Sequence, residues 1–317
     1  MRFSTIAVAA AATVANAQRP SDTPICDYYT TALLKDNTAD NQAKLLTLLV
    51  NTVVIGNYTM PNVGVMVPGI LAEGEQDGSK VNLAPYFNGM LASSNRGDKA
   101  TCVNFLDGGA AEPLKNNKPA NDEKSNHFLL THLYQFFGTL LGCSKQGMSG
   151  FDAYDGNPSM YKVHKFMNLG KPEMDYFITQ VAMAAASFGV AKDDITVVGK
   201  ALGDNFNMRC SAPAEVIKGK GAQPQAICIK SSCDEAKDAK CDAYAEAVAP
   251  ANCTMTSTSS GSMMPTGTSS MNGGGESSMT SSGSMSGSGS ATATPTSTST
   301  TAPQSGGNVN SFGLAAL

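Results

Sequence analysis

Residues 125–140, SNHFLLTHLYQFFGTL, set the fold class of this chain. Ser125 is a good helix N-cap, and the large apolar residues after it recur at spacings of four, three, one and three. Those spacings form one face of a helix, made by Leu129, Leu133, Phe136, Phe137 and Leu140. The alternating pattern that the strands of a β-sandwich need is not seen in this half of the chain. We therefore predict a mainly α fold.

Helical patterns on both sides of this stretch extend the same fold. Upstream, the richly apolar residues 45–54 predict a buried helix. Downstream, Phe177, Val181 and Phe188 share one helical face, and Gly189 is predicted to end that helix. The expected helix starts are Thr38 or Asp40, Asn157 followed by Pro158, Lys171 followed by Pro172, and the pair Asp193 and Asp194.

The region between these helices has a different composition. Residues 62–121 are punctuated by Gly, Pro, Asn and Asp, with short apolar pieces at 63–70 and 81–91. Such punctuation interrupts regular structure, so we predict long loops and short helices here.

The two ends of the chain differ from the middle. Residues 1–17 combine a basic start, an apolar run and the Ala-Asn-Ala cleavage pattern of a secretory signal peptide. Residues 254–307 are almost entirely Ser, Thr, Gly, Met, Ala and Pro, which predicts a disordered, O-glycosylated stalk. Residues 308–317 end in a short apolar tail that is smaller than a complete glycolipid (GPI) anchor signal. We expect a cut-short anchor signal, with release from the cell as the alternative.

The overall composition excludes two classes of protein. The 317 residues carry a formal charge of −4, so the chain lacks the clustered positive charge that nucleic-acid binding requires. The mean hydropathy is −0.13 and no internal run of about 18 apolar residues occurs, so no transmembrane span is expected. With the signal peptide, this predicts an extracellular protein, held at the cell wall or the outer face of the plasma membrane if it is anchored.

Eight cysteines, all within residues 18–253, fit four disulfides in an oxidising compartment. Four of the eight lie close together between residues 228 and 253. We therefore divide residues 18–253 into a helical domain (18–210) and a Cys-rich appendix (211–253). Zinc is the alternative for that cluster, but its spacings miss the paired knuckle of zinc sites. The pairing is not deducible among Cys26, Cys102, Cys143, Cys210, Cys228, Cys233, Cys241 and Cys253. Glycosylation sequons begin at Asn57 and Asn252.

The sequence contains no nucleophile elbow, zinc-protease motif, phosphate loop or dinucleotide fingerprint. The three histidines are then the scarce reactive groups. His127 and His132 are five residues apart, which does not place them on one metal-binding face of a helix. His164 lies between Met160 and Met167 on a short predicted helix, so it is the candidate ligand.

The order of these elements resembles the truncated globins. Tyr154-Asp155-Gly156 is similar to the Tyr-x-Gly of that family's loop, and residues 160–164 (MYKVH) to its ligand helix, which opens with Met and presents a histidine four residues later. Met167 and Leu169 resemble the apolar pair that closes that helix. The resemblance covers residues 127–205, about a quarter of the chain, and implies a globin-like helical core.

The resemblance implies a haem site with His164 as the ligand of the iron. A neutral imidazole is a good axial ligand for haem iron, and apolar surroundings keep the porphyrin bound. Met160 and Met167 would pack beneath the ring, while Leu129, Leu133 and Phe137 would line the pocket. His132 is a second-choice distal or propionate contact.

Two hypotheses for function follow. In the first, the chain is a secreted, surface-tethered globin-like haem protein that binds a diatomic gas or performs peroxide-linked redox chemistry. In the second, it is a cofactor-free, disulfide-stabilised surface module for adhesion to cell-wall glycan or to a host surface. The layout is also similar to that of secreted fungal proteins without an assigned activity, which implies an extracellular location and no particular chemistry.

Overall fold

The computed structural model describes residues 18–59, 63–106 and 125–253, with the side chains of 125–128 excepted. The expected signal peptide, stalk and apolar tail lie outside these residues, as does the side chain of His127.

Helix is the commonest regular structure among the described residues. They are α1 (Ile25–Leu34), α2 (Ala39–Ile55), α3 (Ala84–Phe87), α5 (Ser125–Leu140), α6 (Met160–His164), α7 (Lys171–Ser187) and α8 (Lys192–Phe206), with a 3-10 turn at Cys241–Ala243. The strands are β1 (Gly74–Gln76), β2 (Ser79–Val81), β3 (Asn88–Arg96) and β4 (Lys99–Asn104). The prediction of a mainly α fold is therefore confirmed in part, because strands are present beside the helices.

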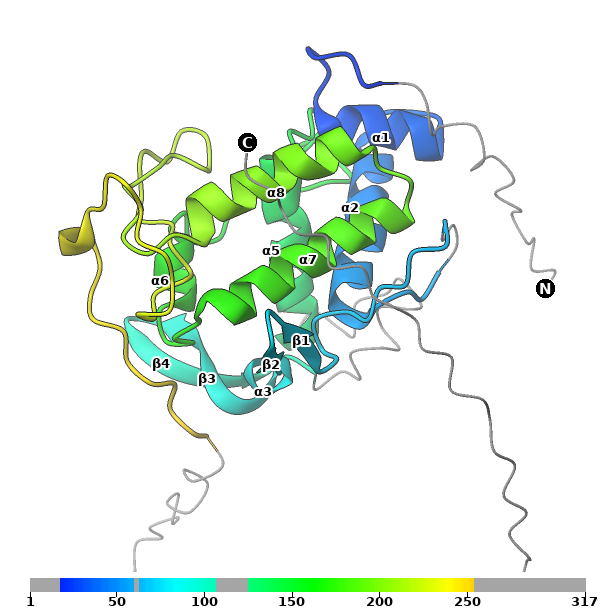
Figure 1. Ribbon diagram of the computed structural model, residues 1–317. Helices are drawn as coiled ribbons and strands as arrows, with labels where there is room; N and C mark the ends of the chain where they lie inside the picture. Colours follow the sequence, from blue (N-terminus) through cyan, green and yellow to red (C-terminus); the bar gives the residue numbers. More distant parts are fainter. Residues whose placement is uncertain (1–17, 60–62, 107–124, 254–317) are drawn as a thin grey trace, which may run out of the picture. The chain divides into compact units, whose positions relative to one another are not determined.

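The long helices pack directly on one another. α2 lies against both α5 and α7, α7 lies beside α8, and α1 lies against α2 (Figure 1). One apolar core joins them, in which Leu46 of α2, Phe137 of α5, Val181 of α7 and Leu202 of α8 are all buried. Burial of these side chains holds the helices together, since helices of this length are marginal in water by themselves.

The helix starts agree with the sequence at two places and differ at two others. Thr38 caps α2 by accepting a hydrogen bond from Asn41 N, and α7 starts at Lys171 as expected. The expected cap at Asn157 is wrong, because Ser159 caps α6 instead, through its contact with Lys162 N. Asp193 and Asp194 do not cap α8; they lie in its first turn.

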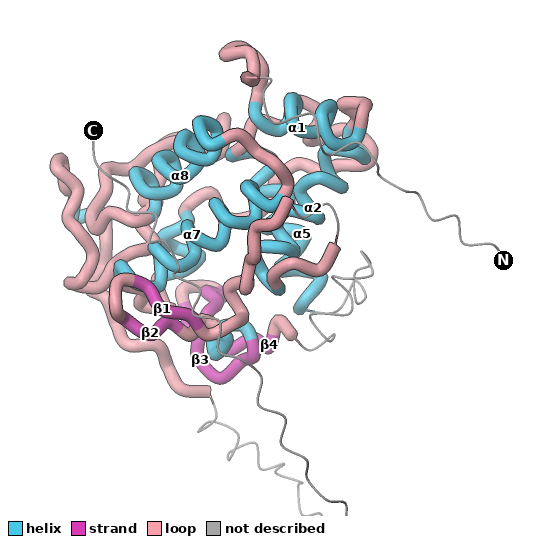
Figure 2. Tube along the Cα trace, turned by 45° about the vertical axis from the view of Figure 1, so that its right-hand side comes forward, coloured by secondary structure: helices cyan, strands magenta, loops and turns pink. Residues whose placement is uncertain are grey.

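The prediction for residues 62–121 is right about a short helix, α3, but it misses the two antiparallel hairpins that the described part of this region also forms. β1 pairs with β2 around Asp77 and Gly78, and β3 pairs with β4 around Gly97 and Asp98. All four turn residues have positive φ, which the right-handed twist of a tight hairpin favours. The strands gather on one side of the helices (Figure 2).

α1 is a further element that the sequence analysis does not predict. Pro24 precedes it, and Cys26 and Tyr29 are buried against the core. α1 is held by covalent and hydrogen bonds to parts of the chain that are distant in sequence. Its own apolar pattern is short, so the local sequence alone does not reveal this helix.

All eight cysteines are paired, which confirms the prediction of four disulfides. The bonds are Cys26–Cys143, Cys102–Cys253, Cys210–Cys241 and Cys228–Cys233. Residues 211–253 pack on the helices: Cys228 and Cys233 are buried in the same core, and the N–H of Ile229 donates to Leu169 O at 3.0 Å.

Candidate functional site

His164 ends α6 with its ring half-buried. Its Nδ1 lies 2.9 Å from Met160 O. A carbonyl oxygen only accepts, so this contact puts the ring proton on Nδ1 and leaves the lone pair of neutral imidazole on Nε2. Burial lowers the pKa of His164, and the Met160 carbonyl opposes that shift without reversing it. The ring is therefore held neutral in a single tautomer, which is the state that a metal-ligating histidine uses.

The two methionines beside His164 are buried, at 5% and 7% exposure for Met160 and Met167. Met160 N donates to Gln225 Oε1 at 3.1 Å, so the start of α6 is fixed to residues from the appendix. On its other side α6 meets the β3–β4 hairpin, where Asn95 Nδ2 donates to Lys162 O at 2.7 Å. The Lys165 ammonium pairs with Asp98 at 3.0 Å, which holds the pKa of that carboxyl below its usual range.

His132 lies in an aromatic cluster between α5 and the loop that precedes α6. Its Nε2 is 3.5 Å from Asp155 Oδ1, and its ring meets Tyr154 edge-on at 6.1 Å between ring centroids. Phe136 packs on Tyr154 and also on Phe206 of α8. Ring contacts therefore hold the Tyr-x-Gly segment against α5, and Phe136 links α5 directly to α8.

An apolar cavity of about 50 Å³ lies among α1, α2, α5, α7 and α8. Phe137 lines it, whereas His164, Met160, Met167, Leu129, Leu133 and His132 do not. Leu129 and Leu133 are half-buried on α5. The structure thus separates the predicted iron ligand from the apolar cavity.

The fit of these residues to haem is partial. The ligand atom is suitable, because His164 offers Nε2 from a neutral ring. The cavity does not fit, because about 50 Å³ is well below the roughly 300 Å³ at which pockets for larger ligands begin. Within the described ranges, no group of three or more His, Cys, Asp or Glu side chains is arranged to hold a metal ion.

A second site lies where the described chain ends. Residues 251–253 run along the free edge of β3: Ala92 N donates to Ala251 O at 2.9 Å, and Cys253 N donates to Met90 O at 2.9 Å. Cys253 is also bonded to Cys102 of β4. The last residues before the Ser/Thr-rich segment are therefore fastened to both strands of one hairpin, and we call residues 251–253 with this disulfide the clasp.

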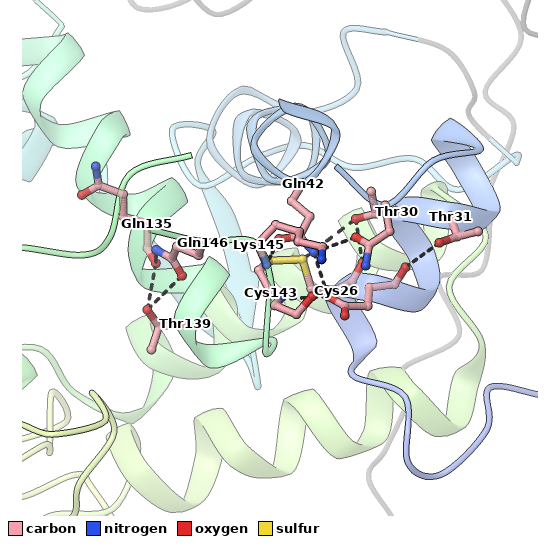
Figure 3. Close-up of a disulfide and its surroundings, with 12 residues drawn as sticks. Cys26, Thr30, Thr31, Gln42, Gln135, Thr139, Cys143, Lys145 and Gln146 are labelled. Carbon is pink, nitrogen blue, oxygen red and sulfur yellow. Dashed lines mark hydrogen bonds between the residues drawn. A yellow bond between two sulfur atoms is a disulfide. The ribbon is translucent and has the colours of Figure 1, made fainter. Parts of the chain in front are cut away.

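The disulfide Cys26–Cys143 lies within a polar network between α1, α2 and the loop after α5 (Figure 3). Asp27 Oδ1 accepts from Ser144 N at 2.9 Å, and Gln42 Oε1 accepts from Lys145 N at 2.9 Å. Gln42 is fully buried, and its amide also donates to Asp27. These contacts satisfy backbone N–H groups of the loop after α5, and they fix α1 to that loop.

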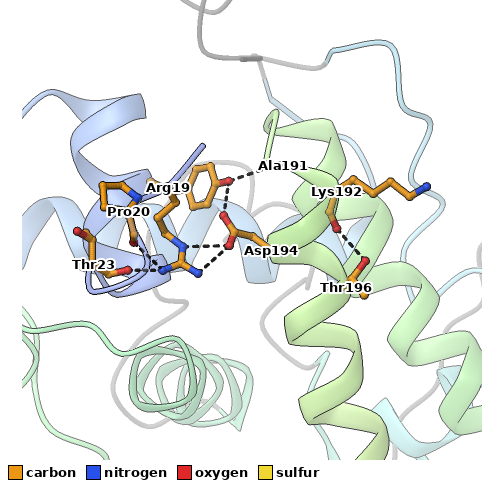
Figure 4. Close-up of polar contacts among 8 residues, drawn as sticks. Arg19, Pro20, Thr23, Ala191, Lys192, Asp194 and Thr196 are labelled. Carbon is orange, nitrogen blue, oxygen red and sulfur yellow. Dashed lines mark hydrogen bonds and ion pairs between the residues drawn. The ribbon is translucent and has the colours of Figure 1, made fainter. Parts of the chain in front are cut away.

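A buried ion pair joins the first described residues to α8 (Figure 4). Arg19 and Asp194 are 2.8 Å apart, with side chains 15% and 8% exposed. Tyr29 OH donates to Asp194 Oδ2 at 2.8 Å and accepts from Ala191 N at 2.9 Å. Burial raises the pKa of Tyr29 to about 12; the Ala191 N–H opposes that rise and Asp194 adds to it. Sequence reasoning missed this site because its members are up to 175 residues apart.

The two sequons occupy different environments. Asn252 is exposed and lies within the clasp. Asn57 is half-buried, and its Oδ1 accepts a hydrogen bond from Val67 N at 2.6 Å.

No family model, curated protein or solved structure matches this chain. None of the helices in the described ranges is both long and apolar enough to cross a membrane.

Proposed function

We propose that this chain is a cofactor-free surface module, carried on a stalk and built to resist pulling while it adheres to cell-wall glycan or a host surface. The clasp carries the proposal. Cys253 is the last residue before the Ser/Thr-rich segment, so any load from that segment enters the domain at the bond to Cys102.

Two disulfides shorten the covalent path through the domain. Along the chain, 227 residues separate Cys26 from Cys253. Through Cys26–Cys143 and Cys102–Cys253 the path contains only the 41 residue-to-residue steps from 102 to 143. A load between the two ends therefore extends a small part of the domain, and the helices α6, α7 and α8 lie outside that path.

Pulling the full oxidised chain from its two ends tests this function. Replacing Cys102 and Cys253 by Ala forces the path through Cys210–Cys241, which gives 79 residue-to-residue steps, from 143 to 210 and from 241 to 253. At about 3.4 Å per residue the extension should grow by about 130 Å. The matched control removes Cys228–Cys233, which lies off the load path, and should leave the extension unchanged. Equal lengthening in both variants would contradict the proposal.

Display at the cell surface is tested on intact cells that secrete the full chain. An antibody to residues 18–253 should label the cells, and labelled cells should adhere to a glycan-coated surface more than cells without the protein. Protein found only in the medium, or adhesion that does not depend on it, would count against the proposal.

Haem binding is the second candidate, and the tautomer of His164 is the observation that favours it. His164 Nε2 would ligate the iron, which would supply gas binding or peroxide chemistry, while Met160 O would hold the ring. Adding haem to the purified chain should give a Soret band that His164→Ala removes and His132→Ala retains. A spectrum unchanged by His164→Ala would exclude this ligand.

A further inference from the structure

The cavity among the helices has a wholly apolar interior. Its lining comes from α1, α2, α5, α7 and α8 and includes Leu46, Phe137, Val181 and Leu202. The hydroxyl of Tyr29 is the one side-chain oxygen of the lining, and it is already bonded to Asp194 and Ala191 N. The lining therefore offers no free hydrogen-bonding group to an occupant.

The size of the cavity limits what enters it. A volume of about 50 Å³ is about a third of the roughly 150 Å³ apolar cavity that stays dry and holds benzene or xenon. It corresponds to about two water-sized groups at about 30 Å³ each. Water itself needs two or more polar partners, which this lining does not supply.

The lining also reaches the surface. Ile195, Val198 and Gly199 of α8 contribute to it and are only half-buried. At Gly199 an added Cβ would meet no atom within 4 Å, so a larger side chain can be placed at this point of the lining.

We propose that this cavity binds one small apolar molecule, the size of a two-carbon hydrocarbon, that has no hydrogen-bonding group. The site is independent of the clasp and of His164, because none of the residues of either lines it. Binding is driven by the removal of apolar surface from water on both partners.

Xenon is the probe that tests the site, on the full oxidised chain without haem. Titration followed by ¹²⁹Xe shifts and by the methyl signals of Leu46 and Leu202 should saturate. Gly199→Leu fills the space from α8 and should weaken xenon binding at least about tenfold. The matched control is Gly203→Leu, also on α8, where an added Cβ also meets no atom within 4 Å but which does not line the cavity. It should bind like the unaltered chain.

Several outcomes would overturn the proposal. These are a linear, unsaturated titration of the unaltered chain, shifts confined to surface methyls, or equal binding by the Gly199 and Gly203 variants. Should Gly199→Leu fail to fold, Val181→Ala provides the second test, because it enlarges the cavity and should tighten xenon binding; no change in affinity would count against the site.

Discussion

The helices and the β3–β4 hairpin with its clasp are held together by different means. In the helical region, side chains from all seven described α-helices share one core, and Leu46 is completely buried within it. In β3 and β4 only a few side chains, such as Ala92 and Val103, are buried. The hairpin is held by backbone pairing, the bond between Cys102 and Cys253, and polar contacts to α6. Apolar burial therefore stabilises one region, and covalent linkage stabilises the other.

The largest effect is expected from the helical core. Leu46→Ala should lower the free energy of unfolding by about 4 kcal/mol, because it removes a fully buried side chain and leaves a cavity. Denaturant unfolding followed by far-UV dichroism measures this. Leu48→Ala, on the same helix but half-buried, is the control and should cost about 1 kcal/mol. Equal losses would mean that α2 is not held by burial.

Removal of the clasp disulfide should have the second-largest effect on the free energy of unfolding. Replacing Cys102 and Cys253 by Ala should lower the free energy of unfolding by about 3 kcal/mol, because it frees a long loop in the unfolded chain. Amide exchange should speed up first at Ala92, whose N–H donates to Ala251 O, while the amides of α2 remain the best protected. Equal loss of protection at Ala92 and in α2 would remove the distinction between the two regions.

The buried ion pair between Arg19 and Asp194 of α8 should contribute less to the free energy of unfolding than the clasp disulfide. Asp194→Asn should cost about 2 kcal/mol, since it leaves Arg19 without its charged partner and weakens the bond from Tyr29. Asp193→Asn keeps the pair intact and makes the same change of charge one residue away on an exposed side chain, so it should be nearly neutral. Thermal unfolding of both variants at one pH measures the difference, and a larger loss for Asp193→Asn would contradict it.

The smallest effect should be a pH dependence that belongs to His164. Its pKa is lowered in the folded chain, so the unfolded chain takes up the proton first as the pH falls. The stability contribution is complete above the unfolded value of about 6.5 and is lost as the pH falls from there toward the lower folded value. His164→Gln should lose less stability than the unaltered chain between pH 7.5 and 5. Parallel curves would show that this ring does not titrate in that window.

The sequence predicts the helical region better than the hairpins, and particular residues show why. The helical face of α5 and the cap at Thr38 are local patterns, and both are found in the structure. Asp77-Gly78 is also a local hairpin signal, but the strands beside it are only three residues long. An alternation of apolar and polar residues is not recognisable over so short a stretch.

The candidate site depends on contacts that one sequence does not reveal. The bond from His164 Nδ1 to Met160 O spans four residues of one helix, so that helix could be predicted as a unit. The contacts of Gln225 with Met160 and of Asn95 with Lys162 span 65 and 67 residues. The disulfide partners were equally hidden, because eight cysteines allow about 105 pairings.

The β3–β4 hairpin, to which the clasp is fastened, also contacts α6, the helix that carries His164. Asn95 and Asp98 bind α6 through the Lys162 carbonyl and the Lys165 ammonium, two residues before and one after His164. The clasp and the imidazole are therefore linked through one hairpin and two polar contacts. Any displacement of this hairpin would loosen two of the contacts that hold the residues on either side of His164.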